Sequence, residues 1–168
     1  MIEYTYLLLE KDRVRKTFVE EIIQENKYIN CCKALDGSCD SDYLEVLDIL
    51  KHREIGIHDS WNPEKEEDDN KKRFLKNKLS LYGSYIRLLE YYKNKSEFTV
   101  VIQDDTMFND QFRMLAENIS NNLPKNKSAR LGQYMSCCIF GNELIDRLIK
   151  NLQRTKVIQP LDHYLIGL

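Results

Sequence analysis

The chain lacks a long hydrophobic run, since no apolar stretch among its 168 residues approaches the roughly 20 residues of a membrane-spanning helix. It also lacks an excess of either charge: 25 lysine and arginine residues nearly balance 27 aspartate and glutamate residues, for a formal net charge of -2. This balance gives no reason to expect nucleic acid or an anionic membrane as the main partner. A signal peptide would place a basic segment before an apolar one, and the N-terminus has no such order. We therefore expect a cytoplasmic protein without a transmembrane segment, or one that is exported by means the sequence does not show.

The five cysteines lack the spacing of a zinc site. They occur as Cys31-Cys32, Cys39 and Cys137-Cys138, whereas zinc sites use C-x-x-C spacing with further cysteines or histidines nearby. An odd number of cysteines without a signal peptide is typical of reduced thiols. The two adjacent pairs lie in strand-like stretches, which favours small core residues over metal ligands. The sequence also contains neither a P-loop nor a G-x-G-x-x-G motif.

Length and hydrophobic patterning predict one α/β domain over residues 1–168. A chain of this length can bury about two thirds of its unfolded surface. Short β-branched or apolar runs predict strands, and apolar residues at helical spacing predict helices between them. Strands are expected over 4–9, 28–32, 98–102 and 133–140, and helices over 13–25, 40–50, 79–93, 110–121 and 142–152. The alternation favours a mainly parallel sheet flanked by helices.

The segment 51–78 differs from the rest of the chain in its charge. It contains the run Glu64-Lys65-Glu66-Glu67-Asp68-Asp69 and the only tryptophan, Trp61. Mixed charge of this kind is typical of a solvated, flexible segment. Long loops in compact domains often act as lids over ligands, so a second interpretation makes Trp61 and His58 contact residues of such a lid.

Two adjacent carboxylates, Asp104 and Asp105, follow the apolar strand over 98–102 almost directly. Open α/β sheets bind their ligands at the carboxyl ends of their strands. Two acidic side chains there are costly unless a positive charge compensates them, and a divalent cation with a bound phosphate would do so. The alternative is that both aspartates only open a turn and cap the next helix.

Four segments resemble, in the same order, motifs of the glycosyltransferase family of lipopolysaccharide biosynthesis and procollagen galactosyltransferases. The first is the strand and Asp-Arg turn Tyr6-Leu7-Leu8-Leu9-Glu10-Lys11-Asp12-Arg13-Val14-Arg15, and the second is the A-x-D-G motif Ala34-Leu35-Asp36-Gly37. The third is the helix 79–92 together with the strand end Val101-Ile102-Gln103-Asp104-Asp105. The fourth consists of the late segments Gly132-Gln133-Tyr134-Met135-Ser136 to Leu148 and Pro160-Leu161-Asp162-His163-Tyr164-Leu165. The similarity spans nearly the whole chain and is carried by the shared order of weak motifs.

The resemblance implies a GT-A-like fold and transfer of a hexose from a nucleotide sugar to a hydroxyl of a glycan or protein acceptor. A UDP-sugar is the first expectation for the donor. It implies Mn²⁺ or Mg²⁺ held by Asp104 and Asp105 against the donor diphosphate. Arg15, Asp36 and Asp104 would then bind the nucleotide sugar, and Asp162 and Asp105 would be catalytic. The residues alone favour a surface ion pair for Arg15 and an Asp-Gly turn for Asp36.

Three departures from the family pattern indicate a reduced member. Gln103 stands where the family's E-D-D motif has its first acid, and only Gly83 remains of its G-C-x-x-S-H helix motif. The segment 121–131 is short where family members carry another strand and acceptor-side loops. One interpretation of these departures is a protein that still binds the nucleotide sugar while its acceptor recognition is altered or lost. The alternative is a catalytically silent relative that serves as a scaffold or interaction protein.

Overall fold

The computed structural model describes residues 1–131 and 136–166. The chain divides into two compact units. The first comprises Met1–Ala34 and Leu88–Ile145, and the second Leu35–Arg87 and Asp146–Leu168. The α/β character predicted from the sequence is confirmed, since helices separate most consecutive strands along the chain.

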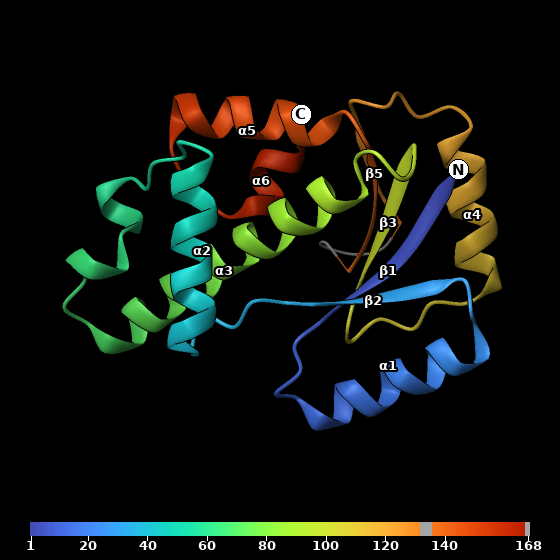
Figure 1. Ribbon diagram of the computed structural model, residues 1–168, viewed down its shortest axis with the longest axis horizontal. Helices are drawn as coiled ribbons and strands as arrows, with labels where there is room; N and C mark the ends of the chain where they lie inside the picture. The colour runs from blue at the N-terminus through green and yellow to red at the C-terminus, as the bar shows by residue number, and fades with distance from the viewer. Residues whose placement is uncertain (132–135, 167–168) are drawn as a thin grey trace. The chain divides into compact units, whose positions relative to one another are not determined.

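The first unit is built on an open five-stranded sheet, drawn from blue to orange in Figure 1. Its strand order is β2-β1-β3-β5-β4, with β1 (Ile2–Leu8), β2 (Ile29–Lys33), β3 (Phe98–Gln103), β4 (Ser128–Arg130) and β5 (Cys137–Gly141). Strand β1 pairs in parallel with both β2 and β3, as predicted, whereas β5 runs antiparallel to β3 and to β4. The sheet is therefore mixed rather than mainly parallel. The six residues between β4 and β5 are too few for a crossover, so these two strands can only pair antiparallel.

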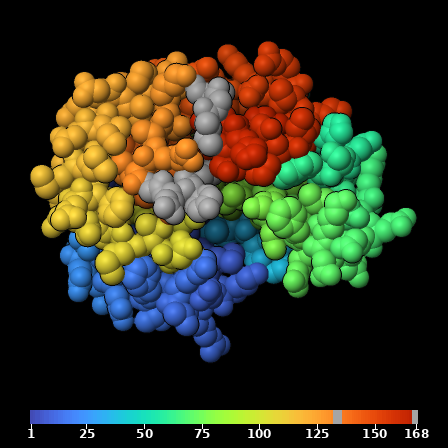
Figure 2. Space-filling view, turned by 180° about the vertical axis from the view of Figure 1, so that it is seen from behind, coloured from blue at the N-terminus to red at the C-terminus, as the bar shows by residue number. Residues whose placement is uncertain are grey.

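Burial on both faces explains why β1 and β3 occupy the middle of the sheet. Five consecutive residues of β3, Phe98–Ile102, are buried, and so are the last five of β1. One face packs on α1 (Arg13–Glu25) and α4 (Asp110–Ser120), which contribute Val19 and Ala116 to a core with Tyr4, Tyr6, Val100 and Ile102. Helix α4 and the segment after it, yellow to orange in Figure 2, lie at the surface of this unit.

The second unit contains the helices α2 (Asp40–His52), η1 (Asp59–Trp61), η2 (Pro63–Lys65), most of α3 (Asp69–Tyr92) and of α5 (Leu144–Thr155), and α6 (Leu161–Ile166). A bridge between Ile57 and Val157 links its two chain segments. Gly83 lets α3 approach α2 closely, because a Cβ at this position would lie 3.0 Å from Cγ2 of Val46.

The charged segment 51–78 is more helical than the loop that the sequence predicts. Helix α3 begins at Asp69, ten residues before its predicted start, and η1 and η2 precede it. The Asp68 carboxylate accepts a hydrogen bond from the Lys71 N–H (2.7 Å) and so satisfies one free donor of the first turn. Ion pairs of Lys71 with Glu66 and of Lys72 with Glu64 (3.7 Å) stabilise the same turn. The mixed charge that suggested a loop thus forms local pairs around a helix start.

Other boundaries differ at short elements. Strand β4 and helix α6 were not predicted, because three and six residues are too short for a recognisable period. The last predicted strand, 133–140, is observed as Cys137–Gly141, and its first three residues lie outside the described ranges. The motif residues Gly132, Gln133, Tyr134 and Met135 lie outside them as well.

Candidate functional site

The strongest candidate site lies at the carboxyl ends of β1 and β3. These strands are parallel neighbours, and Leu7 near the end of one is opposite Gln103 at the end of the other. After β1 the chain continues to β2 on one side of the sheet, whereas after β3 it continues to β4 and β5 on the other side. The two loops therefore diverge at this point, which makes it the topological switch point where open α/β sheets bind ligands.

Asp104, the first residue after β3, is the buried acid of this site. Its side chain is 8% exposed. Its Oδ2 accepts a hydrogen bond from the Leu9 N–H (2.9 Å), and its Oδ1 accepts one from Nη1 of Arg15 (3.0 Å). A buried carboxylate needs such partners, because an unpaired charge in a poorly hydrated site is costly. Asp104 thereby joins the loop after β3 to the loop after β1.

Arg15 lies in the first turn of α1, where its guanidinium faces three carboxylates. Besides Asp104, its Nη2 is 3.8 Å from Oδ2 of Asp105, and its Nε is 3.4 Å from Oδ2 of Asp12. Asp12 also caps α1, since its Oδ1 accepts a hydrogen bond from the Arg15 N–H (3.1 Å). Three acids around one base leave a local excess of negative charge. Asp105 is 52% exposed, against 40% for Asp12 and 8% for Asp104, so its carboxylate is the most open of the three to a ligand.

Tyr6 holds the loop that carries the two aspartates. Its side chain is fully buried, and its hydroxyl donates to the Thr106 carbonyl oxygen (2.8 Å) and accepts from the Phe108 N–H (3.2 Å). Burial raises the pKa of this hydroxyl to about 12, so it is a protonated donor at neutral pH. Sequence analysis did not identify Tyr6 or Asp12 as site residues. Asp12 had a usable signal, an aspartate directly before a helix, whereas Tyr6 looks like any aromatic in a strand.

The structure brings together Arg15, Asp104 and Asp105 from the predicted set, and places Asp36 and Asp162 in the second unit. Asp36 forms a turn in which its Oδ1 accepts from the Ser38 N–H (2.9 Å) and from the Ser38 hydroxyl (2.8 Å). This is the Asp-Gly turn that the residues alone suggested. Asp162 lies in the first turn of α6. The pKa of Tyr82 is raised first by burial and only to a smaller extent by the charge of Asp162.

The carboxylate oxygens of Asp104 and Asp105 are suitable ligands for a divalent metal, but the two side chains do not form a complete metal site by themselves. Carboxylate oxygens are the ligands that Mg²⁺ and Mn²⁺ prefer. Both oxygens of Asp104 already accept hydrogen bonds from the protein, which leaves Asp105 as the open ligand. Within 1–131 and 136–166, no group of three or more His, Cys, Asp or Glu side chains is arranged to hold a metal ion. The residues fit a metal that arrives with a phosphate ligand, since Mg²⁺ commonly binds one or two carboxylates plus substrate phosphates.

The cysteines are free thiols in two environments. Cys137 and Cys138 are buried in β5, as predicted for small core residues, and burial raises the pKa of both to about 12. The same prediction is wrong for Cys31, which is exposed. The reason is that β2 lies at the edge of the sheet, where residues of a short strand are only partly covered.

No family model matches this chain, and no curated protein matches it either. None of the helices in the described ranges combines the length and the apolar character needed to cross a bilayer.

Proposed function

We propose that this protein is a glycosyltransferase of GT-A type that binds a nucleotide sugar at the switch point between β1 and β3. The observation that carries the proposal is the cluster of Arg15, Asp104 and Asp105 at the carboxyl ends of two central parallel strands. A nucleoside diphosphate offers negative phosphates for Arg15 and brings oxygen ligands for a metal beside Asp105. The order of sequence motifs supports the same class.

The geometry divides the roles within the cluster. Asp105 is exposed and would hold Mn²⁺ or Mg²⁺ together with the donor diphosphate. When bound, the metal supplies charge stabilisation of the leaving diphosphate. Asp104 is buried against Arg15 and the Leu9 N–H, so it orients the guanidinium, and it would add a second carboxylate beside a bound metal. Nucleotide binding by Asp36 and a catalytic role for Asp162, toward a glycan or protein hydroxyl, stay predictions.

The test is calorimetric titration of the full chain with UDP, with and without Mn²⁺. We expect binding that requires Mn²⁺ and that Asp105→Ala weakens at least tenfold while the circular dichroism spectrum is unchanged. Asp110→Ala is the matched control, because Asp110 is also exposed and lies in the same unit. Release of UDP from UDP-hexoses then tests transfer. A folded native chain that binds none of UDP, GDP or CMP would refute the proposal.

A silent scaffold is the second candidate, and one observation favours it. Asp104 already accepts hydrogen bonds from Arg15 and from the Leu9 N–H. The cluster can therefore serve only to hold the segments after β1 and β3 together, without any ligand. In that case neither Mn²⁺ nor nucleotide raises the melting temperature of the native chain. A ligand-dependent rise in the melting temperature would exclude this alternative, because only a ligand that binds the folded state stabilises it.

A further inference from the structure

The ends of α2 and α5 lie side by side in the second unit (Figure 1). The Gln153 side chain donates to the Arg53 carbonyl oxygen (2.7 Å), and the Val157 N–H donates to the Gly56 carbonyl oxygen (2.8 Å). A Cβ placed on Gly56 would lie 3.3 Å from Cγ of Lys156. Side chains near the two helix ends therefore share one region of the surface.

Positive charge is concentrated in this region. From Arg147 to Ile158 the chain has four basic residues and no acidic one, although the formal net charge of the whole chain is -2. Arg147, Lys150 and Arg154 follow each other at spacings of three and four, which places them on one side of α5. The basic patch, as we define it, comprises six exposed residues: Lys51, Arg53, Arg147, Lys150, Arg154 and Lys156.

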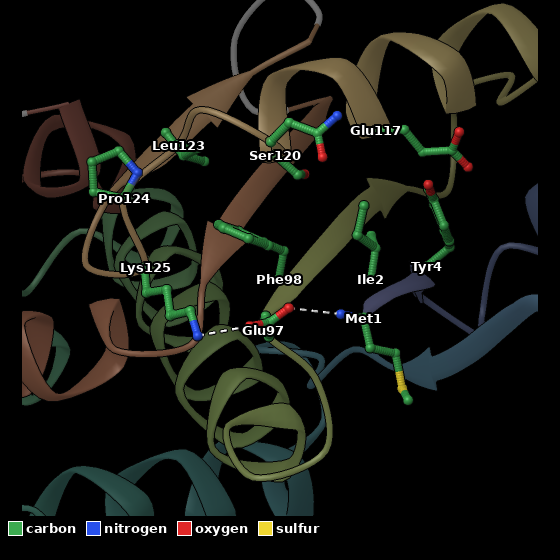
Figure 3. A pocket seen from close by; sticks show the side chains of 11 residues that line it. Met1, Ile2, Tyr4, Glu97, Phe98, Glu117, Ser120, Leu123, Pro124 and Lys125 are labelled. Atoms are coloured by element: carbon green, nitrogen blue, oxygen red, sulfur yellow. Dashed lines mark hydrogen bonds and ion pairs between the residues drawn. The ribbon is translucent and has the colours of Figure 1, made fainter.

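Acidic residues compensate the basic patch only in part. Three acids lie in the segments 51–59 and 146–158, namely Glu54, Asp59 and Asp146. Within the described residues, no ion pair joins an acid to Lys51, Lys150, Arg154 or Lys156. Lys125 of the first unit is different, because its Nζ lies 2.7 Å from the Glu97 carboxylate (Figure 3). The basic patch thus keeps positive charge that an anionic partner can bind.

The helix dipole explains only some of these positions. Lys51 and Arg154 lie in the last turns of α2 and α5, where a cation is favourable. Arg147 lies near the start of α5, where a cation is unfavourable. Lys156 follows the same helix in the left-handed conformation, with φ at 61°, which is usually adopted by glycine. A lysine at such a position favours a role for its side chain.

We propose that the basic patch binds the anionic phospholipid surface of a membrane as a peripheral contact. Clusters of about four to eight lysine and arginine residues on an amphipathic helix are typical of such contacts. The segments 51–59 and 146–158 contain no Phe, Trp or Tyr on which a nucleic-acid base could stack. Ile158, which follows the patch, is 43% exposed and can enter the interfacial layer of a bilayer. Both observations favour a membrane over nucleic acid.

This inference is independent of the proposed nucleotide site. Arg15, Asp104 and Asp105 belong to the first unit, whereas every residue of the basic patch belongs to the second. Loss of nucleotide binding and loss of membrane binding can therefore be measured separately.

Sedimentation of the full chain with lipid vesicles tests the inference. One set of vesicles contains phosphatidylcholine alone, and the other contains three parts of phosphatidylcholine to one part of phosphatidylserine. We expect binding to the second set only. This binding should be lost when NaCl is raised from about 0.1 M to about 1 M, which shortens the Debye length from about 10 Å to about 3 Å. Lys150→Gln/Arg154→Gln should weaken it about 25-fold, because each cation near an anionic surface contributes about fivefold.

Lys27→Gln/Lys125→Gln is the matched control, because it removes the same charge from exposed residues of the first unit. It should change vesicle binding by no more than about twofold, since salt screens charges that lie outside the contact. Lys51→Gln/Lys156→Gln provides a second test if the first patch variant does not fold, and about the same 25-fold loss is expected.

Three results would overturn the inference. The first is a native chain that does not bind the phosphatidylserine vesicles at the lower salt concentration. The second is an equal loss of binding in the patch variants and in the control, which would mean that only the net charge matters. The third is a native chain that binds an RNA duplex through Lys150 and Arg154 and leaves the vesicles unbound, which would assign the patch to nucleic acid.

Discussion

Arg15 is the residue on which the candidate site depends, because its guanidinium pairs with Asp104, Asp105 and Asp12. Its contribution differs among the three. Toward Asp104 it compensates a buried charge, where removal of one partner is costly. Toward Asp105 and Asp12 it makes pairs between partly exposed groups, each worth about 0–1 kcal/mol. Burial, rather than distance alone, decides which aspartate is structural.

The two adjacent aspartates should therefore respond differently to the same substitution. Asp104→Ala leaves the Leu9 N–H and Arg15 without their acceptor and should lower the free energy of unfolding by about 1–3 kcal/mol. Asp105→Ala removes a half-exposed side chain and should change it by no more than about 0.5 kcal/mol. Urea denaturation of both variants measures the difference. Equal losses would mean that burial does not separate their roles.

Tyr6→Phe should loosen the loop that carries both aspartates. The substitution deprives the Thr106 carbonyl and the Phe108 N–H of their shared partner, at a cost of about 1–3 kcal/mol of unfolding free energy. Faster amide exchange at Phe108 is the local measurement. Tyr43→Phe is the matched control, since Tyr43 is also a buried tyrosine and no hydrogen bond is lost with its hydroxyl in the described ranges. An unchanged exchange rate at Phe108 would show that the loop is held by other contacts.

At the scale of elements, the end of β5 depends on a glycine. A Cβ at Gly141 would overlap the backbone carbonyl of Lys125, whereas a Cβ at Gly56 would meet the flexible side chain of Lys156, at 3.3 Å. A backbone group cannot move aside without disturbing its own hydrogen bonds, but a lysine side chain can change rotamer. The two glycines thus offer a matched pair.

Gly141→Ala should lower the free energy of unfolding by about 1–3 kcal/mol, as overpacking against a fixed neighbour does. The Lys127 carbonyl, which accepts from the Gly141 N–H at 3.0 Å, should lose this bond as β5 shifts. Gly56→Ala should be close to neutral. Thermal denaturation of the two variants provides the comparison, and a Gly141→Ala variant as stable as the native chain would contradict the overlap.

At the scale of the whole molecule, buried tyrosines should set the stability of the protein in alkali. Burial is the first cause that raises the pKa of Tyr4, Tyr6, Tyr43 and Tyr92 to about 12, from an ordinary value of 10.0. Below pH 10 these hydroxyls are protonated in both the folded and the unfolded chain. Between pH 10 and 12 the unfolded chain releases protons that the folded chain keeps, so the free energy of unfolding falls.

We therefore expect cooperative unfolding between pH 10 and 12, accompanied by a rise of tyrosinate absorbance. Far-UV circular dichroism and absorbance at alkaline pH, recorded on one sample, should change together. If the tyrosinate signal develops at pH 10 while the circular dichroism is constant, the tyrosines ionise within the folded protein and the prediction fails.

Several elements could be predicted from the sequence because their signal is local. Helix α1 was predicted with its observed bounds, since apolar residues recur at helical spacing after Asp12. Strand β3 was predicted from five consecutive apolar or β-branched residues. The start of α3 was missed, because the charged composition of this segment predicts a loop. Ion pairs and the Asp68 cap instead stabilise a helix start there. Strand β4 was missed, because its three residues form a strand only through their pairing with β5, which their own sequence does not indicate.

The sequence by itself determined the α/β character, the position of Asp104 and Asp105 after a buried strand, and the closeness of Asp12 to Arg15. All of these depend on neighbours along the chain. The tertiary structure decided which aspartate is buried, that Arg15 lies between them, that Tyr6 holds their loop, and that β5 reverses direction. The contacts of Arg15 with Asp104 and of Tyr6 with Thr106 join residues 89 and 100 positions apart. No local pattern encodes a partner at that distance.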